Sequence, residues 1–218
     1  MPGRLIVLEG AEGVGKSTQL RLLAEWIGSR GETVVAVREP GGTIIGDEIR
    51  RLLLDPETDI VPRAEALLFM ASRAQLVERE IRPALARGAT VLVDRFFLST
   101  YAYQGAGRGI PESELRAANA IATTGLVPDI TLLLNMSAEA GLARAAQRGA
   151  HDRMERAELA FHERVAGAFE TFSAAGWQSQ HAECGPIVLV DAQGTEAEVF
   201  QRVQSALQQR WPGSFLSS

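Results

Sequence analysis

One glycine-rich stretch near the start of the chain restricts its fold and chemistry more than any other feature. It reads Gly10-Ala11-Glu12-Gly13-Val14-Gly15-Lys16-Ser17-Thr18, and it matches the phosphate-binding pattern G-x-x-x-x-G-K-[ST] at every defined position. Lys16 is the only lysine among 218 residues, and the other basic residues, apart from three histidines, are all arginine. A compact ammonium fits between two phosphates better than a wide guanidinium does, so we expect the lone lysine to have this role.

The residues on either side of this stretch have the order that a phosphate loop requires. Residues 5–8 are an apolar run, typical of a buried parallel strand. Residues 19–30 then carry apolar side chains at helical spacing, and Gly31 follows them. The loop amides and the helix N-terminus would bind phosphates, and Ser17 would offer its hydroxyl to Mg²⁺. The alternative is a fortuitous glycine turn before a helix.

Four further apolar runs predict the rest of a sheet. They cover residues 33–37, 90–93, 130–134 and 187–190, with stretches of workable helix length between them. This alternation predicts an α/β fold with a five-stranded parallel sheet covered by helices on both faces. The length suits a single domain over residues 1–211, with 212–218 as a loose tail. We read residues 105–109 as a glycine-rich loop within that domain.

Composition excludes several classes of protein. The net charge of −5 argues against a broad nucleic-acid-binding surface. The single cysteine, Cys184, excludes an internal disulfide and a metal site of several cysteines. No apolar run approaches the length of a membrane span, and the N-terminal run is too short for a signal peptide. We therefore expect a cytoplasmic protein that binds neither nucleic acid nor membrane.

Polar residues follow the strands at one edge of the predicted sheet, where ligands bind in such folds. Arg38 follows the second strand and begins Arg-Glu-Pro-Gly-Gly, and Asp94-Arg95 follows the third strand. Asp94 resembles the carboxylate that holds the Mg²⁺ shell after an apolar strand. Arg95 beside it would face a phosphate, although a structural salt bridge is the competing interpretation.

Six blocks in this order make the resemblance to a known family specific. They are Glu9-Gly10-x-x-Gly13-x-Gly15-Lys16-Ser17-Thr18, Arg38-Glu39-Pro40-Gly41-Gly42-Thr43, Leu68-Phe69-x-Ala71-x-Arg73, Asp94-Arg95, Ala102-Tyr103-Gln104-Gly105 and Asp152-Arg153-x-Glu155. Together they resemble thymidylate kinase, from about Leu5 to Asp191. The resemblance implies a three-layer P-loop NTPase fold with a small lid, and ATP-dependent phosphorylation of dTMP with Mg²⁺. It also implies a homodimer.

The resemblance assigns the acceptor site. Phe69 and Arg73 are four residues apart and share a helix face, though from spacing alone Phe69 would be a core residue. By resemblance the Phe69 ring stacks on thymine and Arg73 bonds its carbonyl edge. Tyr103 would lie under the sugar and disfavour a 2′-hydroxyl, and Gln104 would approach the base. From the residues alone, Tyr103 and Gln104 are typical of a half-buried loop.

Further residues complete the implied site. Arg38 and Arg95 would clamp the acceptor phosphate, and Thr100 is placed among the substrate-binding residues. Glu12 resembles the loop carboxylate that sits near the acceptor sugar hydroxyl or the metal. Lys16 and Arg95 are assigned to catalysis.

A cluster of arginines predicts a lid over residues 144–156. Thymidylate kinases carry a catalytic arginine either in the phosphate loop or in the lid, and this phosphate loop has none. The chain therefore resembles the lid-arginine type, with Arg153 as the first catalytic candidate and Arg148 as the second. Arg144 and Arg156 belong to the same cluster. The competing interpretation is a solvated helix face.

Three other functions are alternatives for a chain with a phosphate loop. A regulatory GTPase needs an Asn-Lys-x-Asp motif, which cannot exist when Lys16 is the only lysine. A kinase for another small acceptor and a non-catalytic nucleotide-binding module both stay open.

Overall fold

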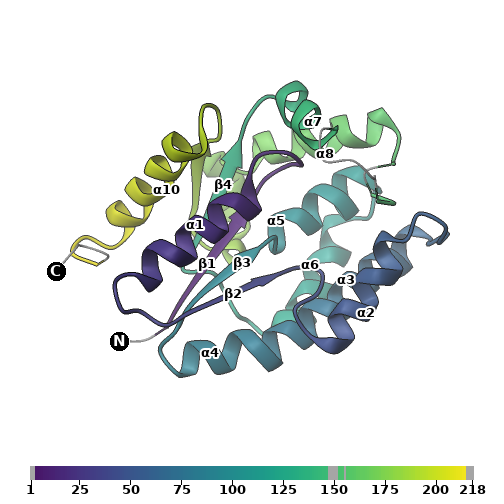
Figure 1. Ribbon diagram of the computed structural model, residues 1–218. Coiled ribbons are helices and arrows are strands. Elements are labelled where there is room, and N and C mark those ends of the chain that lie inside the picture. Colours follow the sequence, from purple (N-terminus) through teal and green to yellow (C-terminus); the bar gives the residue numbers. More distant parts are fainter. Residues whose placement is uncertain (1–2, 147–151, 155, 215–218) are drawn as a thin grey trace.

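The computed structural model describes residues 3–146, 152–154 and 156–214. It contains a five-stranded sheet in the order β2-β3-β1-β4-β5, and every neighbouring pair is parallel. The strands are β1 (Arg4–Glu9), β2 (Val34–Arg38), β3 (Thr90–Asp94), β4 (Ile130–Asn135) and β5 (Ile187–Asp191). All five predicted strands are confirmed, and Figure 1 shows them at the centre of the molecule.

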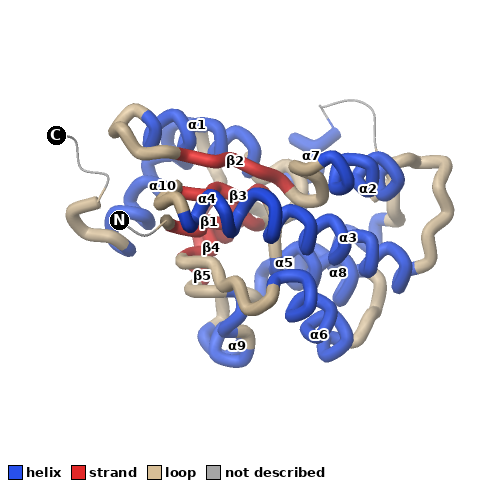
Figure 2. The backbone as a smooth tube through the Cα atoms, turned by 90° about the horizontal axis from the view of Figure 1, so that it is seen from below, coloured by secondary structure: helices blue, strands red, loops and turns tan. Residues whose placement is uncertain are grey.

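Helices cover both faces of this sheet. The α-helices are α1 (Lys16–Gly28), α2 (Ile44–Leu54), α3 (Pro62–Leu76), α4 (Arg82–Ala86), α5 (Phe97–Thr100), α6 (Glu112–Thr123), α7 (Ala138–Ala146), α8 (Leu159–Thr171), α9 (Ala175–Gln180) and α10 (Glu196–Arg210). Two π-helices, η1 (Val77–Ile81) and η2 (Tyr101–Gly107), continue α3 and α5, and η3 (Ala182–Cys184) is a 3₁₀ turn. Figure 2 shows the strands running between the helical layers.

The side chains of alternate residues of β1 belong to two separate hydrophobic cores. Leu5 and Val7 pack with the layer that contains α3, α4, α6 and α8. Ile6 and Leu8 pack instead with α1 and α10. A strand that is buried on both faces needs apolar residues at consecutive positions, which explains why the apolar runs predicted the strands so well.

The first helix begins earlier than the periodicity predicts. α1 starts at Lys16, whereas the apolar spacing indicated a start at residue 19. Gly15 precedes it with a φ of 91°, in the left-handed region that favours glycine. The phosphate-loop residues from Lys16 onward therefore form the first helical turn and have no apolar pattern of their own.

The prediction of a loop at residues 105–109 is wrong for residues 105–107. Residues 105–107 belong to η2, and Tyr103 and Gln104 are buried within the same π-helix. A Cβ atom at Gly107 would lie 2.5 Å from Cε2 of Phe161 on α8. Glycine is therefore required there by close helix packing, which sequence inspection does not separate from a turn.

Two predicted segments are described only in part. The predicted lid, 144–156, includes the end of α7 and residues 152–154 and 156, while residues 147–151, with Arg148, lie outside the described residues. In the C-terminal segment, Arg4 NH2 donates to Ser214 Oγ at 2.9 Å. None of the described helices is long and apolar enough to cross a membrane. Cys184 is fully buried, as expected of a packing residue.

Candidate functional site

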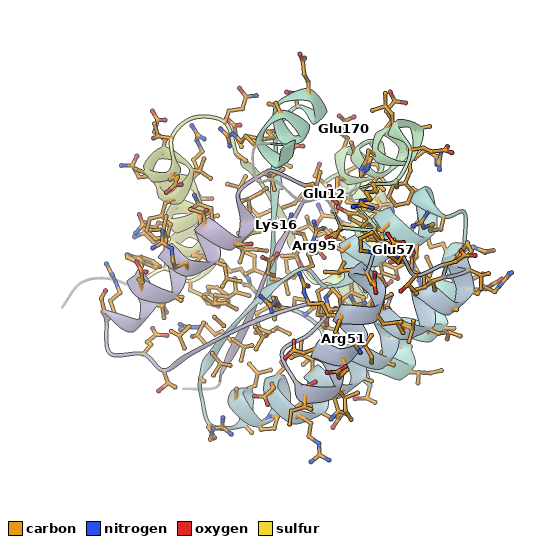
Figure 3. All side chains as sticks on the ribbon, turned by 45° about the vertical axis from the view of Figure 1, so that its right-hand side comes forward. Glu12, Lys16, Arg51, Glu57, Arg95 and Glu170 are labelled. Carbon is orange, nitrogen blue, oxygen red and sulfur yellow. The ribbon has the colours of Figure 1, made fainter. Side chains whose placement is uncertain are left out.

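A pocket of about 310 Å³ opens where β1, β2 and β3 end. Its walls contain most of the site residues predicted from the sequence: Glu12, Gly13, Gly15, Lys16, Ser17, Thr18, Arg38, Phe69, Arg73, Asp94, Arg95, Thr100, Tyr103 and Gln104. Ala11 and Val14 line a smaller hollow behind the loop. Figure 3 shows Glu12, Lys16 and Arg95 close together near the centre of the molecule. One cavity thus joins the phosphate loop to the predicted acceptor site.

Lys16 lies almost wholly inside the phosphate loop. Its Nζ donates to the backbone oxygens of Gly10 at 3.0 Å and Ala11 at 2.6 Å. Burial, together with the charge of Arg95, lowers the pKa of the Lys16 ammonium to about 7. An anion bound in the loop would oppose both effects and favour the charged ammonium.

A hydroxyl and a carboxylate meet at the edge of the loop. Ser17 Oγ donates to Asp94 Oδ2 at 2.8 Å, and the bond joins the first turn of α1 to the end of β3. Mg²⁺ prefers such oxygen ligands and usually takes one or two carboxylates, with phosphate and water oxygens for the rest. Within the described ranges no group of three or more His, Cys, Asp or Glu could hold a metal. The Ser17 hydroxyl and the Asp94 carboxylate are themselves oxygen ligands of the kind that Mg²⁺ takes together with phosphate and water oxygens.

Arg95 has an unusual backbone. Its φ is 71°, in the left-handed region, and its N–H donates to the oxygen of Leu8 at 3.0 Å. Its NH1 donates to the Gly10 oxygen at 3.3 Å and to Ser99 Oγ at 3.1 Å. Burial opposes the charge, but Tyr103 and Asp94 nearby raise the pKa of Arg95 above its usual value. The guanidinium stays charged at the pocket wall.

A fourth arginine of the pocket, Arg50 on α2, was not predicted from the sequence. It lines the pocket with Arg38, and its NH1 donates to the Pro40 oxygen at 2.9 Å. Burial first, and then the positive charge of Arg38, lowers the pKa of Arg50. Like charges gathered in this way favour a bound anion. The neighbouring Arg51 pairs with Glu48 at 2.9 Å and lies away from Lys16 and Arg95 in Figure 3. Because the two arginines occupy adjacent positions on α2, no local sequence pattern shows which of them enters the pocket.

The far end of the pocket has a buried arginine in its floor. Arg73 donates through Nε to Glu39 Oε2 at 2.7 Å and through NH2 to the Phe96 oxygen at 2.7 Å. Its NH1 donates to Thr100 Oγ1 at 2.9 Å and to Asn119 Oδ1. Every nitrogen of the guanidinium therefore has an acceptor within the protein. A ligand carbonyl would have to replace one of these partners or share a nitrogen with it.

Glu39 and Phe69 complete this end of the pocket. Desolvation raises the pKa of Glu39, although the charge of Arg73 opposes the rise. Its Oε1 is buried and, among the described residues, has no hydrogen-bond partner. Phe69 is half-buried and lines the pocket instead of filling the core, so its ring is available to a ligand.

Tyr103 and Gln104 connect the pocket to two carboxylates. Tyr103 donates its hydroxyl to Glu12 Oε1 at 3.2 Å, and its ring lies 5.0 Å from the Arg95 guanidinium carbon. Gln104 donates through Nε2 to Glu65 Oε1 at 3.0 Å. The phosphate loop and η2 therefore share one wall of the cavity.

Comparison with known proteins identifies the family. The thymidylate kinase family model matches residues 8–184. The thymidylate kinase of Deinococcus radiodurans is 45% identical over 208 residues, covering 95% of this chain and 98% of that protein. That of Trichodesmium erythraeum is 42% identical over 226 residues, covering 96% and 97%. This chain belongs to the thymidylate kinase family. Every residue lining the pocket, from Glu12 to Met154, lies inside the matched region of the thymidylate kinase model.

One predicted catalytic residue of this thymidylate kinase family member lies outside the pocket wall. Arg153 donates through NH2 to Glu65 Oε2 at 2.7 Å and through Nε to the Leu53 oxygen at 2.8 Å. Its neighbours Asp152 and Met154 do line the pocket. Although Glu65 is fully buried, hydrogen bonds from Arg108, Gln104 and Arg153 lower its pKa. Arg153 can therefore reach a ligand only by leaving a well-bonded carboxylate.

Proposed function

We propose that this chain transfers the γ-phosphoryl group of ATP to the phosphate of dTMP and so forms dTDP. The observation that carries the proposal is the single pocket, with a phosphate loop at one end and an aromatic–arginine floor at the other. Membership of the thymidylate kinase family supports the choice of substrates.

The donor end holds the phosphates of ATP. The loop amides and Lys16 would neutralise the transferred group, as phosphate loops do. Ser17 and Asp94, already joined at 2.8 Å, would hold the Mg²⁺ that accompanies ATP. The ion would supply positive charge to the phosphate oxygens during transfer.

The acceptor end holds the phosphate of dTMP with arginines from three separate elements. Arg38 comes from the end of β2, Arg50 from α2 and Arg95 from the residue after β3. Their role is to fix the acceptor oxygen close to the donor phosphorus, because positioning and charge account for most of the rate in phosphoryl transfer. A catalytic base is not required.

The base and sugar of dTMP occupy the floor and the η2 wall. Phe69 would stack on thymine, and Arg73, Thr100 and Gln104 carry the polar groups nearest to it. The Tyr103 ring would lie under the sugar, where it would disfavour a 2′-hydroxyl. Glu12, which accepts the Tyr103 hydroxyl, would sit near the sugar hydroxyl or the metal.

Negative charge that develops on the transferred phosphoryl group must be neutralised in part by residues outside the phosphate loop, because that loop has no arginine. We assign this role to the lid arginines Arg153 and Arg148. Arg153 would exchange Glu65 for a phosphoryl oxygen when both substrates are bound. Such an arginine stabilises the transition state more than the bound substrates.

A coupled assay of ADP release across a panel of nucleoside monophosphates tests this function. Fast turnover with dTMP, and much slower turnover with ribonucleotides and purine monophosphates, is the expected result. Preference for another monophosphate would support the alternative kinase, and nucleotide binding without ADP release would indicate a binding module.

The active form is proposed to be a cytoplasmic homodimer. Helices α3 and α6 pack against each other, and each carries a large exposed apolar side chain: Leu67 is 64% exposed and Ile121 is 79% exposed. Apolar side chains that a monomer would leave in water are typical of an interface between copies. Light scattering on the unaltered protein and on Leu67→Glu tests this, because a monomer in both would contradict it.

A further inference from the structure

Glu9, the last residue of β1, has a buried carboxylate that binds the start of α5. Its side chain is fully buried. Oε1 accepts the backbone N–H of Phe96 at 2.7 Å and that of Ser99 at 3.0 Å. Oε2 accepts the hydroxyl of Ser99 at 2.7 Å. A buried charge is costly unless it is well bonded, and these three bonds come from the short segment that directly follows Arg95.

The bonds around Ser99 have a defined polarity. A carboxylate only accepts, so the Ser99 hydroxyl must donate its single proton to Glu9. The oxygen of the same hydroxyl then accepts from Arg95 NH1 at 3.1 Å. The result is a chain of bonds in which Arg95 donates to Ser99 and Ser99 donates to Glu9.

This chain of hydrogen bonds holds the side chain of Arg95, a residue whose backbone conformation is strained. Arg95 has a φ of 71°, and its NH1 has one other acceptor, the Gly10 oxygen, at 3.3 Å. A planar guanidinium that is fixed at one nitrogen by two acceptors has its plane set, and with it the direction of the remaining N–H groups. Losing the shorter of the two bonds would leave the longer bond to Gly10 and the contact with the Tyr103 ring to hold that plane, so the guanidinium would be oriented less firmly.

We propose that Glu9 and Ser99 are positioning residues, which act together through one hydrogen-bond chain to hold the Arg95 guanidinium toward the phosphate of the acceptor. The inference rests on the proposed function for the role of Arg95, whereas the chain itself is a feature of the fold. Ser99 lines the pocket, whereas Glu9 does not. Their effect on the reaction is exerted through the orientation of Arg95.

Two nearly isosteric changes test the chain. Ser99→Ala removes the hydroxyl and leaves the backbone bonds to Glu9. Glu9→Gln keeps an acceptor for the two backbone N–H groups but places an NH₂ group near Ser99, which reverses the polarity of that bond. Each change should lower kcat/KM for dTMP by about 10- to 100-fold, the loss seen when a supporting bond is removed and a reacting group is misplaced. KM for ATP should change by less than about threefold in Ser99→Ala, because Ser99 lies outside the donor loop, whereas Glu9 directly precedes Gly10 of that loop.

The decisive measurement repeats these changes in an Arg95→Ala background. If Ser99 acts only through Arg95, Ser99→Ala should have almost no further effect on kcat/KM once Arg95 is gone. The same loss in both backgrounds would overturn the proposal, and so would an unchanged kcat/KM for Ser99→Ala alone. Turnover of dTMP by the unaltered enzyme tests the proposed function separately.

Asp129→Asn provides a matched control. Asp129 directly precedes β4 and binds the opposite end of β1 from Glu9. Asp129 Oδ2 accepts the backbone N–H of Leu5 at 2.7 Å, so it too is a carboxylate that binds the backbone across β1. Asp129→Asn should lower the melting temperature without altering kcat/KM for dTMP. Equal kinetic losses in Asp129→Asn and Glu9→Gln would show that both carboxylates act only on general stability, and would contradict a positioning role.

Discussion

The guanidinium of Arg73 and the carboxylate of Glu39 form an ion pair, with 2.6 Å between NH2 and Oε2, and their side chains are only 2% and 3% exposed. The pair joins the end of β2 to α3 beneath the proposed base site. A buried ion pair of this kind adds little net stability, but removing one partner leaves the other charge buried and unpaired. Arg73 therefore links recognition of the substrate to stability of the fold.

Arg73→Ala should weaken dTMP binding and destabilise the protein together. We expect the KM for dTMP to rise by about 10- to 100-fold, the value of one hydrogen bond to a charged group. The free energy of unfolding should fall by about 3–5 kcal/mol, because Glu39 would stay buried without its partner. Steady-state kinetics and urea denaturation measure the two effects. Tyr103→Phe should be milder because its ring remains, and an unchanged KM in Arg73→Ala would contradict the assignment to base recognition.

Nucleotide binding should be coupled to protonation of Lys16. With a pKa near 7, the amine is mainly neutral at pH 8 in the free protein. Bound phosphates favour the charged form and raise the pKa, so binding of Mg·ATP at pH 8 should take up about one proton. Calorimetry in buffers of different ionisation enthalpy measures the uptake. Lys16→Arg is the control, because a guanidinium is already protonated; equal uptake in both proteins would assign the proton to another group.

Lys16→Ala should abolish turnover and leave the fold intact. Among the described residues, the side chain bonds to backbone oxygens of its own loop, so its removal takes charge from the phosphate site and leaves the hydrophobic cores unchanged. Thermal melting close to that of the unaltered protein, with no ADP release, is the expected result. Substantial residual turnover would mean that the loop does not hold the donor.

Asp94→Asn should increase the requirement for magnesium. The change preserves the shape of the side chain but removes the negative charge of the carboxylate, which together with the Ser17 hydroxyl would bind Mg²⁺. The Mg²⁺ concentration for half-maximal rate should rise by at least about tenfold, the lower end of losses seen when a metal-binding group is altered. Asp191→Asn is the control, because Asp191 is also the last residue of a strand but accepts the N–H of Gln193. An equal shift in both variants would remove Asp94 from the metal site.

Arg153→Ala should lower kcat by orders of magnitude, about 10³–10⁵ for an arginine that neutralises the phosphoryl group, with dTMP affinity close to normal. Arg156→Ala should be far milder. Glu65→Gln removes the carboxylate that holds Arg153 at 2.7 Å and should not reproduce the loss in kcat. If Arg153→Ala and Glu65→Gln instead caused equal, small losses, the pair would be a structural tie between the lid segment and α3.

The elements that could be predicted share a local cause. The central strands β1, β3 and β4 bury both faces, so their apolar residues are consecutive. The phosphate loop binds through its own backbone and one lysine, so its residues are contiguous. Errors arose where packing between distant segments decided the outcome. Gly107 was read as part of a loop because the ring of Phe161, which excludes a side chain there, lies far along the chain.

The phosphate loop, the five parallel strands and the family could all be inferred from the sequence, since they depend on short motifs and local periodicity. Which of the adjacent Arg50 and Arg51 enters the pocket could not be inferred without the folded structure. Only it could show that Glu9 binds Ser99, 90 positions away, and that Arg153 pairs with Glu65, 88 positions away. The physical reason is that a side chain's charge and hydrogen bonds are satisfied by whatever folding brings beside it, and no local pattern encodes a partner so distant.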